Sequence, residues 1–104
     1  MMMSNLVIAE RELLWAPKGG DERKPLTIRV FAPRQIEEGS VNFEFSPGTS
    51  RCVVDFDGIN EKVEFFGMDS LQALEMVSSL DRYLAGFSQK YDFYWMTGEP
   101  YFDE

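Results

Sequence analysis

The sequence predicts an α+β fold of two layers, in which an antiparallel meander of about five to six β-strands packs on one long amphipathic helix. Apolar residues first alternate with a period of two, which is typical of half-buried strands. From residue 69 to residue 86 they recur every three or four positions, which indicates a helix. Neither element can cover its own apolar face, so we expect both to pack together in a single domain of residues 1–104.

Six segments are expected to be strands. They are residues 5–15, 26–32, 41–45, 51–57, the segment around Val63 and Phe65, and residues 91–96. The first is rich in Leu, Val and Ile, and we expect a bulge in it. In the second, which is bounded by Pro25 and Pro33, apolar residues alternate with other residues. In the third, Val41, Phe43 and Phe45 point to one side.

The helix is expected to begin after Asp69, which is a good N-cap residue. Gln72 follows three positions later, which completes a capping box. Gly86 is the expected C-terminal stop. The apolar stripe expected to face the sheet consists of Leu71, Leu74, Val77, Leu80, Leu84 and Phe87.

The chain has a single cysteine, Cys52, which shares a strand face with Val54 and Phe56. We therefore expect a buried and inert thiol. One cysteine cannot form a disulfide within the chain, and the first residues do not have the pattern of a signal peptide. The protein is therefore expected to be cytoplasmic and to have no contact with a membrane.

Composition disfavours several classes of function. The 104 residues include no histidine and carry a formal net charge of −8. Without histidine there is no Ser-His-Asp or Cys-His machinery, so we expect a protein that is not an enzyme and has no catalytic residue, metal or cofactor. Its ten basic residues are scattered, which disfavours nucleic acid. The charge favours a protein partner that is itself basic, although its identity is open.

The candidate partner-binding residues lie in an acidic, aromatic C-terminal tail of about residues 97–104. They are Glu99, Tyr101, Phe102, Asp103 and Glu104. Aromatic side chains are enriched in the cores of protein interfaces, and the acidic ones would attract a basic partner. The sheet face that the helix leaves open, with Phe31, Val53 and Phe66, is a second candidate binding surface.

Two alternatives remain open. One is a divalent-metal-dependent enzyme that uses Asp55 and Asp57, which lie on one strand face, together with Asp21 or Glu22 of the Gly-Gly-Asp-Glu turn. The other is a structural unit that forms a homodimer through an exposed sheet edge or face.

The segment from residue 52 to residue 84 carries a recognisable pattern. A Cys-bearing strand is followed by Gly58 and Ile59, a returning strand and a Gly-x-Asp-x-x-Gln-Ala-Leu helix start at Gly67. The pattern resembles a family of small bacterial α+β domains of unknown function. The resemblance implies an α+β domain and supplies no catalytic residues. More loosely, a small acidic chain of this design also resembles the immunity proteins that neutralise toxins.

Overall fold

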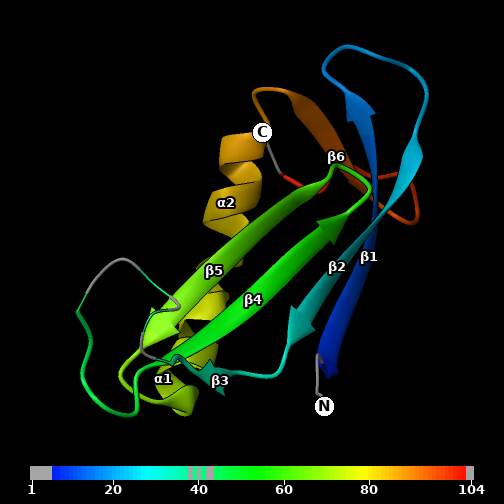
Figure 1. The fold of residues 1–104 in the computed structure, drawn as a ribbon. Helices are drawn as coiled ribbons and strands as arrows, with labels where there is room; N and C mark the ends of the chain where they lie inside the picture. Colours follow the sequence, from blue (N-terminus) through cyan, green and yellow to red (C-terminus); the bar gives the residue numbers. More distant parts are fainter. Residues whose placement is uncertain (1–5, 38, 40, 42–43, 103–104) are drawn as a thin grey trace.

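The computed structural model describes residues 6–37, 39, 41 and 44–102, and the fold is α+β (Figure 1). Its strands are β1 (Val7–Pro17), β2 (Lys24–Phe31), β3 (Arg34–Gln35), β4 (Ser50–Asp57), β5 (Glu61–Gly67) and β6 (Tyr91–Trp95). The helical segment has 18 residues and consists of α1 (Ser70–Glu75), the 3₁₀ turn η1 (Met76–Ser79) and α2 (Leu80–Phe87).

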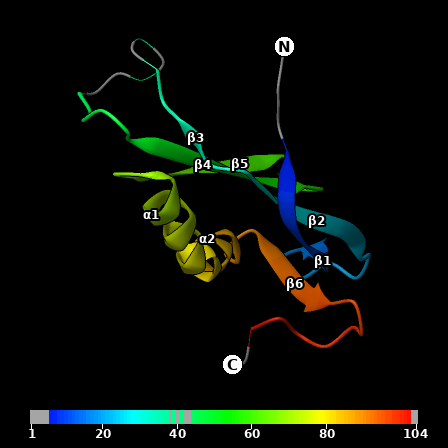
Figure 2. The same ribbon diagram turned by 90° about the horizontal axis from the view of Figure 1, so that it is seen from below.

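All described strand pairs are antiparallel. β4 pairs with β5 along one side and with β2 and β3 along the other. β2 also pairs with β1, and β1 with β6, so the last strand of the chain lies beside the first. Figure 2 shows the helical segment on one side of β4 and β5. The chain therefore crosses from one edge of the sheet to the other through the helical segment.

The strand expected at residues 41–45 lies partly outside the described residues. Asn42 and Phe43 lie outside the described residues, and the described neighbours Val41, Glu44 and Phe45 are not in a strand. A two-residue strand, β3, forms earlier, directly after Pro33. Pro33 lacks an N–H group and interrupts β2, and the chain then resumes pairing with β4.

The first strand contains the expected bulge. Its pairing with β2 shifts between Val7 and Ala9. β1 runs from Val7 to Pro17, two residues later at each end than the segment expected from the sequence.

The helix begins where the sequence predicts. The Asp69 side chain accepts a hydrogen bond from the backbone N–H of Gln72 at 2.8 Å, as an N-cap residue does. The Gln72 side chain reaches back and accepts one from the backbone N–H of Met68 at 2.6 Å. Helical structure continues past Gly86 and ends at Phe87.

Most of the expected stripe packs toward the core, but its first residues do not. Leu84 is fully buried, and Val77, Leu80 and Phe87 pack against the core. Leu71 is 66% exposed, and Ala73 is fully buried instead. A Cβ atom on Gly67, the last residue of β5, would collide with the backbone of Ala73. The helix therefore begins so close to β5 that only a small side chain fits at the contact, and Leu71 is turned outward.

The core lies between the helical segment and one face of the sheet. Its buried residues are Leu13, Leu26, Ile28, Val30, Cys52, Val54, Phe56, Ile59, Phe65, Ala73, Leu84 and Phe93. Cys52 is buried as predicted, and its thiol donates to the backbone oxygen of Phe31 at 3.2 Å. Burial raises the pKa of this thiol, which keeps it in the unreactive protonated form.

Candidate functional site

β1 is longer than the strand beside it. It pairs with β2 from Val7 to Trp15, but with β6 only from Leu13 to Pro17. Within the described part of the chain, residues 7–12 therefore have a strand on one side only. An unpaired edge of this kind can accept another strand.

The hydrogen-bonding groups at this open edge can be identified from alternation. Lys18, directly after β1, donates its N–H to the backbone oxygen of Lys90 on the β6 side at 2.9 Å. The peptide groups of every second residue face the same side of a strand. Counting back from Lys18, the N–H and C=O groups of Glu12 and Glu10 face the open edge. Those of Arg11 face β2.

An apolar groove lies beside this edge, between β1 and the helical segment. The β1 groove, as we call it, is a cavity of about 380 Å³. Its apolar lining residues are Ile8, Ile28, Val30, Leu74, Val77 and Leu80. Ile8 is 44% exposed and Leu74 37% exposed, so this apolar surface is open to solvent. Apolar surface next to free backbone groups is a suitable place for a partner to bind.

The polar rim of the β1 groove includes Arg11 and Asp81, and Tyr101 holds them together. Arg11 Nη1 donates to the Tyr101 hydroxyl at 2.6 Å, and this hydroxyl donates to Asp81 Oδ1 at 2.5 Å. The Arg11 guanidinium also lies 5.7 Å from the centre of the Trp95 ring. Burial, and then the hydrogen bond to Asp81, raise the pKa of Tyr101. The chain after β6 is thus attached to both β1 and α2.

The predicted partner-binding residues of the tail differ in their exposure to solvent. Tyr101 and Phe102 are half-buried, pack against the core and contact each other edge to face at 5.0 Å. Glu99 is exposed, and its backbone oxygen accepts from the N–H of Trp95. Asp103 and Glu104 lie outside the described residues. The role of the tail in partner binding stays a prediction.

The carboxylates considered for metal binding are separated. Asp57 forms an ion pair with Arg29 at 2.8 Å, and Arg29 also pairs with Glu10 at 3.0 Å. These bonds raise the pKa of Arg29, with the Asp57 bond contributing most. Asp21 and Glu22 lie exposed in the connection between β1 and β2. Among the residues that the structure describes, no three His, Cys, Asp or Glu side chains are grouped closely enough to hold a metal ion.

Comparisons with known proteins gave no match to a family model, to a curated protein or to a solved structure. The resemblance to a family of small bacterial domains therefore stays a prediction. Within the described ranges, no helix has the length and apolar character needed to span a membrane.

Sequence reasoning did not identify the β1 groove. The run Leu6-Val7-Ile8-Ala9 is expected to be part of a bulged strand, although it lacks the alternation of a strand with one buried face. That missing alternation was an available signal for apolar side chains outside the core. The open edge could not be predicted from the residues of β1 themselves, because it depends on how far β6 pairs along β1.

Proposed function

We propose that this protein is a cytoplasmic, non-enzymatic protein-binding domain, immunity-like or accessory in role, that captures an extended segment of a basic partner at β1. In this proposal the fold has two layers, and part of the apolar surface of its long amphipathic helix lines the β1 groove. The observation that carries it is the unpaired edge of residues 7–12 directly beside this groove.

A strand added at this edge would satisfy two kinds of contact at once. The backbone groups of Glu10 and Glu12 would complete main-chain hydrogen bonds with it, which give affinity without regard to sequence. Every second side chain of the added strand would point to the helix side of the sheet. Those side chains would meet Ile8, Leu74 and Val77. An apolar residue at every second position is therefore the expected pattern in the partner.

Charge favours a partner segment with basic residues at the remaining positions. The chain carries a net charge of −8, and Glu10 and Glu12 stand on the edge itself. Glu12 has no ion pair among the described residues. Glu10 is already paired with Arg29, and Arg11 is bonded to Tyr101. A basic residue of the partner would thus meet the Glu12 carboxylate, and we expect binding to weaken as salt rises.

Two substitutions of Glu12 test strand addition. Glu12→Pro removes an N–H from the open edge and leaves the pairing of β1 with β2 in place, since proline is tolerated at sheet edges. Glu12→Gln removes the same charge but keeps the N–H. The probe is a synthetic peptide of alternating lysine and valine, with binding followed by fluorescence anisotropy. We expect Glu12→Gln to retain most of the wild-type affinity and Glu12→Pro to lose about tenfold or more.

Equal affinities of the two variants would contradict strand addition. A glutamate-valine peptide that binds as tightly as the lysine-valine peptide would contradict a basic partner. Light scattering tests whether the edge instead binds a second copy of the chain. A wild-type dimer that Glu12→Pro converts to a monomer would assign the edge to self-association.

A further inference from the structure

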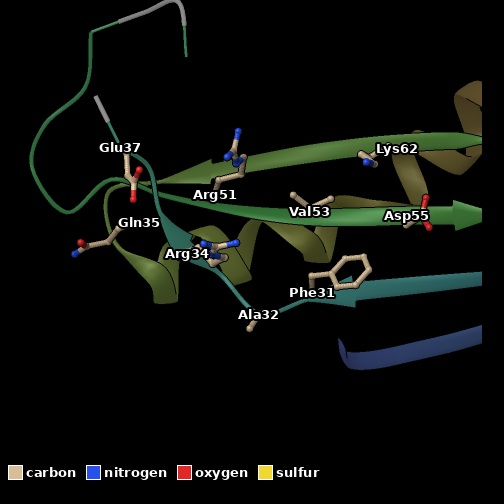
Figure 3. Close-up of a pocket in the computed structure, with 9 residues that line it drawn as sticks. All are labelled: Phe31, Ala32, Arg34, Gln35, Glu37, Arg51, Val53, Asp55 and Lys62. Atoms are coloured by element: carbon tan, nitrogen blue, oxygen red, sulfur yellow. The ribbon is translucent and has the colours of Figure 1, made fainter. Parts of the chain in front are cut away.

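A second pocket lies on the sheet face opposite the helical segment (Figure 3). Along β4, Cys52 and Val54 point into the core, so Arg51, Val53 and Asp55 point to this other face. Together with Phe31 and Ala32 at the end of β2 and Arg34 in β3, they line a cavity of about 350 Å³. This volume is within the range of small-molecule sites, which begins at about 300 Å³.

Two arginines stand opposite each other in this pocket. Arg34 of β3 and Arg51 of β4 are direct cross-strand partners, and such partners have side chains on the same face. Like charges at directly opposite positions destabilise a sheet. Arg51 has one ion pair, with Glu64 at 3.6 Å, and Arg34 has none among the described residues. An anion bound between the two guanidinium groups would offset their mutual repulsion.

The charge of this pocket differs in sign from that of the whole chain. Three basic side chains and two carboxylates line it, although acidic residues outnumber basic ones by 18 to 10 in the sequence. Figure 3 shows Arg34 and Arg51 next to each other toward the end where Glu37 lies, and Asp55 and Lys62 at the other end. Asp55 is also the cross-strand partner of Lys62. The two neighbouring arginines therefore form the positive part of the pocket.

The lining is also partly apolar. Phe31 and Val53 are half-buried, and both line the pocket together with Arg34 (Figure 3). An aromatic ring offers a flat contact surface, and guanidinium groups bind carboxylate and phosphate through two parallel hydrogen bonds.

We propose that this pocket binds a small organic anion, in which a carboxylate or phosphate group is attached to a flat apolar body. The anionic group lies between Arg34 and Arg51, and the apolar body contacts Phe31 and Val53. The site is on the opposite face from the β1 groove and is independent of the function proposed there.

Titration calorimetry with phenyl phosphate, benzoate and inorganic phosphate tests the proposal. We expect wild-type protein to bind phenyl phosphate or benzoate at one site and inorganic phosphate more weakly, and the tighter of the two aromatic probes identifies the preferred anionic group. Arg34→Gln and Arg51→Gln should each weaken binding about tenfold or more. Phe31→Ala should remove most of the preference for the aromatic probe over inorganic phosphate.

Arg82→Gln is the matched control, because it removes the same charge from an exposed position of α2 outside the pocket. It should bind like wild type. Arg34→Gln also relieves the repulsion with Arg51, so its melting temperature should equal or exceed that of wild type, which separates lost binding from lost folding. The proposal is wrong if neither aromatic probe binds at millimolar concentration, or if Arg82→Gln weakens binding as much as Arg34→Gln.

Discussion

At the scale of single residues, the Tyr101 hydroxyl connects three parts of the chain beside the β1 groove. It accepts from Arg11 and donates to Asp81, and so joins β1, α2 and the chain after β6. The sequence indicated aromatic residues in the tail but not this network, since partners 90 and 20 positions away cannot be identified from local spacing.

Replacing Tyr101 by Phe removes this hydroxyl and keeps the ring. We expect the free energy of unfolding at pH 7 to fall by about 1–3 kcal/mol, because both hydrogen bonds involve a charged partner. Urea denaturation followed by circular dichroism measures it. A variant as stable as wild type would contradict a structural role for the network.

The same variant carries a pH dependence. The pKa of Tyr101 is raised in the folded protein, so the protonated hydroxyl stabilises the fold. That contribution is fully present below the unfolded pKa of about 10 and is lost as the pH rises through the raised pKa. The stability difference between wild type and Tyr101→Phe should therefore shrink above pH 10. Other groups titrate in both proteins alike, so the comparison isolates Tyr101.

Gly67 offers a second test at the residue scale. A methyl group there would collide with the backbone of Ala73, so Gly67→Ala should lower the free energy of unfolding by about 2 kcal/mol or more. Gly86→Ala is the control. Its Cβ would meet no atom within 4 Å inside α2, and we expect it to stabilise by about 0.5–1 kcal/mol. Thermal melts that rank the two variants in the opposite order would contradict the close approach of α1 to β5.

At the scale of elements, local patterns predicted most of the structure. The period of 3.6 located the helix, the Asp69 cap located its start, and five of the six expected strands are present. The described residues of the segment 41–45 are not in a strand, because alternation describes one segment, whereas a strand also needs a pairing partner. The outward position of Leu71 was not predictable from the sequence of the helix, because the contact between Gly67 and Ala73 sets the start of α1.

Two substitutions in the helical segment test which face is buried. Leu84 is fully buried, so Leu84→Ala should lower the free energy of unfolding by about 2–5 kcal/mol. Leu71 is 66% exposed, so Leu71→Ala should change it by about 0.5 kcal/mol or less. Equal losses in chemical denaturation would mean that Leu71 is buried against the sheet, as Leu84 is.

At the scale of the whole molecule, the domain is elongated. Its radius of gyration is 15.5 Å, against about 13 Å for a compact domain of this length. An extended shape exposes more of the sheet. The N-terminal half of β1 extends beyond its pairing with β6, and no helix covers the face of β4 opposite the helical segment in the described part of the chain. These are the two surfaces for which we propose ligands. Neither was predictable from the sequence in detail, because each depends on which strands are neighbours.

The most direct test of strand addition at β1 is amide hydrogen exchange measured by NMR, with and without the lysine-valine peptide. We predict that the amides of Glu10 and Glu12 exchange about tenfold or more slowly when the peptide is bound. The amide of Arg11, which faces β2, should already be protected in the free protein and change little. Unchanged exchange at Glu10 and Glu12, or protection confined to residues 97–102, would contradict binding at this edge.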